Sequence, residues 1–207
     1  MQRRSHVSEE GWLLSYADLL TNLVIYFAVI MGAAQMSRGQ LQDLGEEISG
    51  VEQPHSLSAM HEALAQSIAE QGLDEVVQAE LDDDGLRLSL NSGIVFQTGS
   101  GDIKATHEPL LDHMLETLVP YADRYAFAVE GHTDSRPFQT EDGRSNWDLS
   151  SQRAIAVRQR LEEVGVDRRR VRVEGYADTV PLPEEALVGL SEDERHARHR
   201  RVIVRVF

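Results

Sequence analysis

The chain has 207 residues, of which 41% are hydrophobic and 27% charged, a composition that allows a packed core. Its formal net charge of −15 makes nucleic acid a poor ligand, because phosphate backbones are bound by lysine and arginine. The sequence has no cysteine, which excludes disulfides, cysteine-ligated zinc, a cysteine nucleophile and a lipid-modified N-terminal cysteine.

The first predicted element is a membrane-spanning helix over residues 13–34, which are almost wholly apolar. About 22 helical residues span roughly 33 Å, close to the thickness of the hydrocarbon core of a bilayer. Arg3 and Arg4 precede the span and acidic residues follow it, so the positive-inside rule predicts that residues 1–12 are cytoplasmic. A cleaved signal peptide is the alternative, but the apolar run is longer than a typical signal core and contains Asp18.

Asp18 is the residue in this span that most needs an explanation. Ser15, Thr21 and Asn22 stand at i−3, i+3 and i+4 from it, so one face of the helix is polar. Removal from water favours the protonated form of a carboxyl group, which suits a proton carrier. The stripe predicts an ion path at a helix–helix interface, and the alternative is a carboxylate that only holds two helices together.

A sequence motif surrounds this acid: W-x-x-x-Y-A-D-x-x-T, from Trp12 to Thr21. It resembles the membrane segment of MotB-type stator subunits. The resemblance implies that Asp18 binds and releases the driving ion, a proton or, alternatively, sodium, with no bound cofactor. It further implies a self-dimer in the bacterial inner membrane, within a hetero-oligomer with a larger, multi-span MotA-like A subunit. The residues expected to line the ion path are Ser15, Tyr16, Thr21 and Asn22.

Residues 35–84 are expected to be a periplasmic plug and linker region. Leu41, Leu44 and Ile48 have the spacing of a short amphipathic helix. In MotB-like proteins a helix at this place acts as a plug that blocks ion flow, and a simple interfacial helix is the alternative. A second helix is predicted from four further apolar positions that end near Gly72, namely Leu57, Met60, Leu64 and Ile68.

Residues 85–207 alternate between strand and helix patterns and are expected to form one domain. Strands are predicted at 86–90, 125–130, 171–174 and 202–207, and helices at 106–119, 145–164 and 191–198. Thr106 is the expected cap of the first of these helices, while S-x-x-D and S-x-x-E boxes begin the other two. The alternation predicts an α/β domain in which helices pack on a mixed sheet.

Polar chemistry is concentrated at 131–134, which reads GHTD, and at the start of the helix at 145–164. Asn146, Leu149 and Arg153 share one face of that helix. Asp134 and Arg153 could therefore line one groove and bind a zwitterion, the acid holding an ammonium and the arginine a carboxylate. A structural Asp–Arg ion pair explains the same two residues equally well.

The segments GHTD, NWDLSSQRA, GYADTVP and HRRVIV occur in this order in the chain. Together they resemble the OmpA-like peptidoglycan-binding domain, over about residues 85–207. The resemblance implies an α+β sandwich whose mixed sheet has helices on one side, preceded by a single N-terminal transmembrane helix. It implies that Asp134 and Arg153 grip the diaminopimelate of the peptide stem, and that Asn146, Leu149 and Arg201 complete the site. The motif HRRV has His199 where the family usually has asparagine.

Two other kinds of chemistry are disfavoured. His196 and His199 stand at i and i+3, but no third metal ligand accompanies them, so a basic helix end is expected rather than a metal site. His132 and Asp134 lack the nucleophile motif that a hydrolase needs, so no enzymatic activity is expected.

The two halves together predict a stator subunit of a rotary membrane motor. Its single span would place the C-terminal domain in the periplasm, anchored to peptidoglycan, while ion flow past Asp18 drives torque. One alternative is a subunit of the Zorya anti-phage system, which has a similar plan. Another is a passive wall anchor of the OmpA type, which has no use for Asp18.

Overall fold

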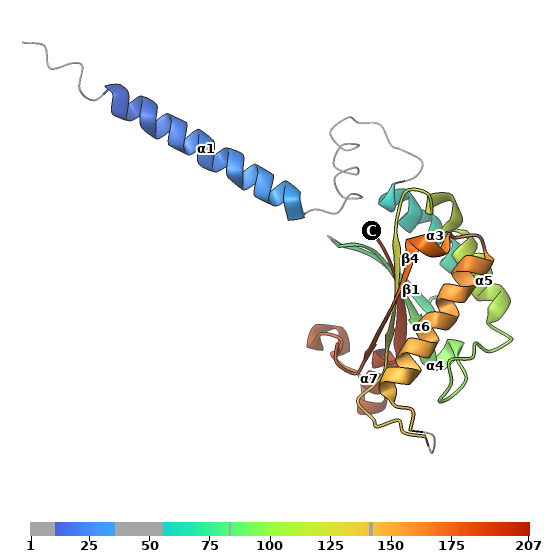
Figure 1. Ribbon diagram of the computed structural model, residues 1–207. Coiled ribbons are helices and arrows are strands. Elements are labelled where there is room, and N and C mark those ends of the chain that lie inside the picture. The colour runs from blue at the N-terminus through green and yellow to red at the C-terminus, as the bar shows by residue number, and fades with distance from the viewer. Residues whose placement is uncertain (1–10, 36–55, 83, 141–142) are drawn as a thin grey trace, which may run out of the picture.

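The computed structural model describes residues 11–35, 56–82, 84–140 and 143–207 (Figure 1). The first element, α1 (Gly11–Gln35), is a helix of 25 residues. Its segment Trp12–Gly32 is long and apolar enough to cross a membrane, with a mean hydropathy of 1.8. The plug helix predicted around residues 41–48 and the basic residues before the span lie outside the described residues.

The described residues after α1 contain a five-stranded sheet in the order β1-β2-β5-β3-β4. Every neighbouring pair is antiparallel except β3 and β4, which are parallel. The sheet is therefore mixed, as predicted from the sequence. Its strands are β1 (Val77–Asp82), β2 (Gly85–Asn91), β3 (Phe127–His132), β4 (Val171–Ala177) and β5 (Arg201–Val206).

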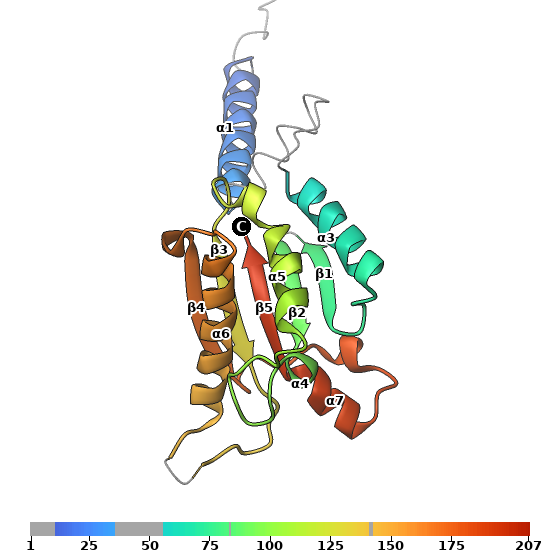
Figure 2. The same ribbon diagram turned by 90° about the vertical axis from the view of Figure 1, so that its right-hand side faces the viewer.

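Helices α3 (Leu57–Gln71), α5 (Glu108–Glu116) and α6 (Asn146–Glu163) cover one face of this sheet (Figures 1 and 2). Alternate residues of β2 and β5 point into the layer between them: Leu86, Leu88, Leu90, Val202, Val204 and Val206 are all buried. The expected arrangement, with helices on one side of a mixed sheet, is confirmed. The shorter elements are α4 (Ser92–Val95), α7 (Glu192–His199), η1 (Val119–Tyr121), η2 (Arg168–Arg170) and η3 (Glu184–Leu187).

The packed unit begins earlier than predicted. Helix α3 lies where the apolar spacing placed it and ends at Gly72 (φ 64°), and its apolar face belongs to the same core as the sheet. Strand β1 then pairs along β2, from Val77 opposite Leu90 to Asp82 opposite Gly85. Residues 57–82 are therefore part of the folded domain and not of a linker, and the boundary expected at residue 85 is wrong.

The ends of three helices test the predicted caps. The backbone N–H and the hydroxyl of Ser145 both donate to the carboxylate of Asp148 (2.8 and 2.9 Å), which begins α6 as the sequence indicated. Ser191 and Glu194 make the equivalent box at α7. The predicted cap at Thr106 is wrong, because α5 begins one residue later, after His107, and makes no side-chain cap.

Helix α6 approaches the sheet at two glycines. A Cβ on Gly131 of β3 would stand 2.0 Å from the backbone oxygen of Ser150, and one on Gly175 of β4 would stand 2.2 Å from Oγ of Ser151. No Cβ fits against the backbone at Gly131, so glycine is required there, while a Cβ on Gly175 would have to displace the hydroxyl of Ser151. The first residue of GHTD and the first of GYAD thus let the first turns of α6 lie against β3 and β4.

We expect Gly131→Ala to lower the free energy of unfolding by roughly 3 kcal/mol, because the helix and the strand must separate to admit the methyl group. Denaturant titration of the full chain in detergent micelles, followed by circular dichroism, measures the change. Gly93→Ala is the matched control, since its Cβ would meet nothing closer than 3.4 Å. Equal stability of the two variants would contradict the close-packing explanation.

Candidate functional site

The polar face of α1 is present in the structure. Thr21 Oγ1 donates to the backbone oxygen of Asp18 at 2.9 Å, and the amide of Asn22 lies 3.4 Å from Asp18 Oδ1. Ser15 and Tyr16 stand one turn or less before Asp18 on the same helix. The helix is exposed along its described side chains, so the carboxylate and its neighbours are available to another chain.

A second candidate site is a groove of about 390 Å³ at the end of the sheet where β3 stops, which we call the main groove. Ligand sites in sheets with βαβ units form outside the carboxyl ends of parallel strands, and the unit β3–α6–β4 opens its groove there. The side chains that carry the site are Phe96, Asp134, Phe138, Asn146, Leu149, Arg153 and Arg200.

Four of the five predicted ligand-binding residues meet in this groove. Asp134 follows β3 by two residues, while Asn146, Leu149 and Arg153 project from one face of α6. The amide of Asn146 donates to the backbone oxygens of Asp134 (3.4 Å) and Arg136 (3.1 Å). Asn146 therefore also holds the loop that carries Asp134 in place.

The fifth, Arg201, is a correction. Its guanidinium donates to the backbone oxygens of His199 (3.2 Å) and Val180 (3.1 Å), and it does not line the main groove. Its neighbour Arg200 does, with Nη1 2.6 Å from Asp134 Oδ2. The reason is strand alternation: Val202, Val204 and Val206 face the core, so Arg201 must point to the opposite face of β5.

Arg153 forms the floor of the main groove and is only 4% exposed. Its guanidinium lies over the ring of Phe96 at 5.4 Å, and its Nε donates to the backbone oxygen of Ser100 at 3.1 Å. Burial, followed by the nearby charge of Arg200, lowers the pKa of Arg153 to about 10. Among the residues that the structure describes, its Nη1 has no hydrogen-bond partner. The floor of the groove is thus a buried cation with a free donor, which suits an anionic ligand.

Asp134 and Arg153 are therefore not an ion pair with each other. Asp134 is paired with Arg200, and His196 Nδ1 lies 3.9 Å from its carboxylate. Thr133 Oγ1 and Ser92 Oγ belong to residues that also line the groove, and neither has a hydrogen-bond partner in the described part of the chain. The groove is thus lined by a carboxylate that is paired with Arg200 and by a buried guanidinium that is not paired with that carboxylate.

Sequence reasoning missed Phe96, Phe138 and Arg200. The two phenylalanines lie between regular elements, where no periodic pattern indicates which side chains are brought together. Arg200 could have been found from the sequence. It directly precedes β5, and the alternation of side chains along an extended chain places neighbouring residues such as Arg200 and Arg201 on opposite sides.

His199 occupies the position that departs from the family motif. Its Nδ1 accepts a hydrogen bond from the backbone N–H of Leu182 at 3.3 Å, which ties the end of α7 to the chain after β4. Burial lowers the pKa of His199, which favours the neutral ring that this bond requires.

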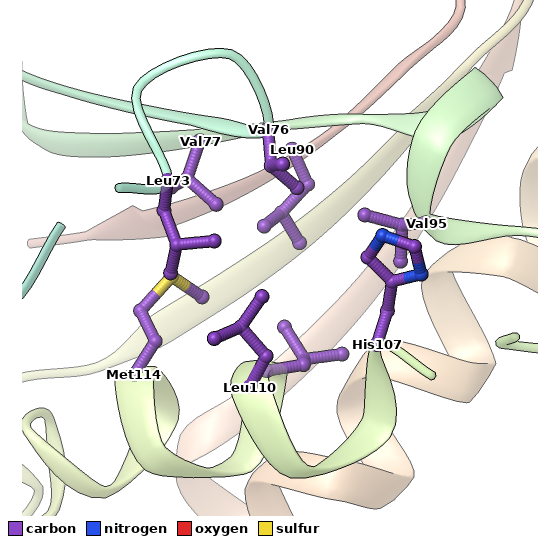
Figure 3. A pocket seen from close by; sticks show the side chains of 9 residues that line it. Leu73, Val76, Val77, Leu90, Val95, His107, Leu110 and Met114 are labelled. Carbon is purple, nitrogen blue, oxygen red and sulfur yellow. The ribbon is translucent and has the colours of Figure 1, made fainter. Parts of the chain in front are cut away.

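Two further places do not supply a ligand site. Figure 3 shows an apolar cavity between α5 and the sheet, and its volume of about 10 Å³ holds at most one water. The side chains around the cavity are Leu73, Val76, Val77, Leu90, Val95, His107, Leu110, Leu111 and Met114.

Among residues 11–35, 56–82, 84–140 and 143–207, no three histidine or acidic side chains converge on a metal position.

Comparison with known proteins agrees with this geometry. The OmpA family profile matches residues 95–189, and the profile described as "Membrane MotB of proton-channel complex MotA/MotB" matches residues 2–51. Motility protein B of Bacillus subtilis is 22% identical over 98% of this chain and 94% of its own length.

Solved structures share the fold of the sheet domain. The cell wall anchor of the T6SS from Pseudomonas aeruginosa is 30% identical, with a TM-score of 0.59 over 70% of this chain and 96% of that one. The periplasmic domain of Helicobacter pylori MotB is 23% identical, with a TM-score of 0.55 over 63% of this chain and 80% of that one.

The chain is a MotB-like protein with an OmpA-like domain. Its relatives are structural proteins rather than enzymes. The family and α1 together make it a single-pass protein of the inner membrane. Both resemblances seen in the sequence are confirmed.

Acid is expected to lower the stability of the OmpA-like domain through His132, the histidine of the GHTD motif. His132 is 1% exposed, stacks on Tyr176 with ring centroids 5.3 Å apart, and lies 3.5 Å from Glu130. Burial lowers the pKa of His132, although the neighbouring carboxylate of Glu130 opposes this shift. The unfolded chain then binds more protons than the folded one below about pH 6.5, so stability falls as the pH drops through that value.

We expect the free energy of unfolding to decline less between about pH 7.5 and 5.5 in His132→Phe, which keeps a ring against Tyr176 but cannot titrate. Denaturant titrations at a series of pH values give the slope. His113→Gln, at an exposed position, is the control that keeps the wild-type slope. A wild-type slope in His132→Phe would rule out His132 as a source of the acid sensitivity.

Proposed function

We propose that this protein is the ion-conducting B subunit of a rotary stator, in which Asp18 carries the driving proton while the OmpA-like domain holds peptidoglycan. The observation that carries the anchoring half is the buried guanidinium of Arg153 with its free Nη1. Arg153 has no carboxylate partner among the described residues; such a buried cation is costly, and an anionic ligand group offsets that cost.

The ligand that best suits the main groove is the diaminopimelate of the peptide stem. A carboxylate of the ligand would meet Arg153, and its ammonium would meet Asp134. The ammonium must compete with Arg200 for Asp134, because their nitrogen and oxygen are 2.6 Å apart. Displaced from Asp134, Arg200 would itself be free to bind a second anionic group of the ligand.

The ion path is proposed from α1. A carboxylic acid within an apolar span is expensive unless it exchanges a proton or meets a partner, and Thr21 and Asn22 supply polar contacts beside Asp18. A second copy of α1 and a larger multi-span A subunit of the MotA type would complete the path. Loss and gain of the charge on Asp18 would reshape that partner, and the wall anchor would resist the resulting rotation.

The proposed orientation places residues 1–12 in the cytoplasm and the sheet domain in the periplasm. Residues 35–50 are proposed to be the plug that prevents ion flow before the stator is assembled, a role supported by the family profile over residues 2–51. The second candidate function is a passive wall anchor, which the likeness to the T6SS anchor favours.

For the wall anchor, Arg153→Ala is expected to reduce co-sedimentation of the full chain with insoluble peptidoglycan at least tenfold, because it removes a charged ligand contact of about 1.5–3 kcal/mol. Arg158→Ala is the matched control: the same residue type on α6, paired with Glu162 and outside the groove. Retention of Arg153→Ala at the level of Arg158→Ala would refute the assignment of the main groove.

For the ion path, Asp18→Asn is expected to abolish motor function and proton flux while wall binding stays intact, because an amide does not exchange a proton near neutral pH. Flux is measured with a cytoplasmic pH probe in cells that also produce the A subunit. Val24→Thr, a nearly isosteric change on another face of α1, is the control that keeps flux. Persistent flux through Asp18→Asn would refute the assignment of Asp18 as the carrier of the driving ion.

A further inference from the structure

The end of the sheet opposite the main groove carries a cluster of arginines at one corner. Strands β3 and β4 both begin there, with Phe127 opposite Val171 in their ladder. The short helix η2 leads into β4, and the end of η1 leads into β3. We call this place the arginine corner, and its arginines are Arg124, Arg168, Arg169, Arg170 and Arg172.

The arginine corner has the opposite sign of charge to the chain as a whole. The formal net charge of the chain is −15, yet the side chains of the corner are five arginines against two acids, Asp123 and Asp167. The acids at the end of α6 do not change this balance, because Glu162 and Glu163 are paired with arginines of the same helix. A local excess of positive charge on so acidic a protein suits an anionic partner.

The guanidinium groups of the corner are largely available. Arg168 is exposed and makes no hydrogen bond or ion pair with the described part of the chain. Arg172 is exposed too and lies over the ring of Phe207 at 4.8 Å, while Arg169 is paired at the surface with Asp167 at 2.8 Å. Each of these forks keeps N–H donors that can bind a phosphate group in a bidentate way.

The chain itself brings the arginine corner close to a membrane surface. Helix α1, the membrane span, ends at Gln35, and α3 begins at Leu57, at the same end of the sheet as the corner (Figure 2). The residues between these helices, 36–56, reach at most about 75 Å when fully extended. A tether of this length keeps lipid headgroups at a high effective concentration, so a modest attraction for each arginine is enough for binding.

The charges along this end of the sheet also determine which part of it can approach an anionic surface. Asp82 and Asp84 lie at the turn between β1 and β2, across the sheet from β4, and they share one arginine, Arg87, at 3.2 and 3.5 Å. An anionic surface would attract the arginine corner and not this turn. The domain would therefore rest on the side of β3 and β4, with the main groove at the far end of the strands.

We propose that the arginine corner is a docking surface for the anionic phospholipid headgroups of the membrane that holds α1. Its guanidinium groups would bind lipid phosphates, and the docked domain would present the main groove on the side away from the bilayer. Docking would thus orient the domain before it meets a ligand. This inference depends on attachment of the chain to a membrane and on the charges of the corner, and not on the ligand of the main groove or on the ion path.

The experiment places the full chain in nanodiscs of phosphatidylcholine, with or without phosphatidylglycerol. Because the sequence has no cysteine, Glu116→Cys at the end of α5 that leads towards β3 can carry a single donor dye, and energy transfer to acceptor-labelled headgroups reports docking. The chain is expected to dock where phosphatidylglycerol is present and to be released by high salt, which screens exposed charges. In this background, Arg168→Gln/Arg169→Gln/Arg172→Gln should lower the ratio of docked to undocked domain at least tenfold.

Two controls accompany this variant. Arg144→Gln/Arg195→Gln/Arg198→Gln removes the same charge before α6 and within α7, at the groove end of the domain, and should dock as the parent does. The triple lysine variant of the corner keeps the charge and should still dock, which separates lost attraction from lost folding.

Three outcomes would overturn the docking surface: equal energy transfer in the two kinds of nanodisc, unchanged docking of the glutamine variant of the corner, or an equal loss in the groove-end variant. If the chain ignores phosphatidylglycerol but retains soluble polyphosphate through the same arginines, the corner belongs to a phosphate polymer instead. No peptidoglycan or A subunit is present, so a failure here leaves the proposed wall binding and ion path untouched.

Discussion

The close approach of α6 to β3 and β4 is the constraint on which the site depends. Gly131 leaves no room for a Cβ against the backbone of Ser150, and a Cβ on Gly175 would displace the hydroxyl of Ser151, so the start of the helix lies directly against the sheet. Ser150 adds a specific contact, since its Oγ accepts a hydrogen bond from the backbone N–H of Ala177 at 3.2 Å. Seating the helix in this way puts one of its faces beside the chain that leaves β3. The glycines of the two motifs are therefore not ligand-binding residues but the reason the ligand-binding residues meet.

The main groove contains two charged side chains, Asp134 and Arg153, that differ in whether an opposite charge is paired with them. Asp134 is neutralised by Arg200 within the protein, while Arg153 is buried without a carboxylate and is held by a ring and a backbone oxygen. A protein pays in stability for such a cation unless a ligand supplies the counter-charge. The asymmetry explains why one of the two predicted explanations, a structural bridge between Asp134 and Arg153, does not describe this groove. In the proposed complex, Arg200 would pair with Asp134 in the free protein and with an anionic group of the ligand in the bound protein.

Much of the fold could be predicted because its signals are local. The boxes at Ser145 and Ser191 and the alternating leucines of β2 each depend on a few neighbouring residues, and each was found in the structure. Strand β1 was missed because it is an edge strand in which only Val77 is buried, so it carries no period-2 pattern.

The main groove could be predicted only in part. Residues on one face of α6 follow from helical geometry, whereas the contact of Arg153 with Phe96 depends on tertiary packing that leaves no local trace.

The path of the chain through the domain has a mechanical consequence. Helix α3 runs towards the end of the sheet where β1 begins, so its first residue lies at the opposite end from the groove (Figure 2). In the proposed stator, the tether from the membrane would therefore enter at one end of the strands, and the wall would be held at the other. A pull between membrane and wall runs lengthwise along the strands and loads the hydrogen bonds of each ladder together in shear, instead of opening them one after another. A domain arranged in this way can transmit a sustained force without unravelling from its edge.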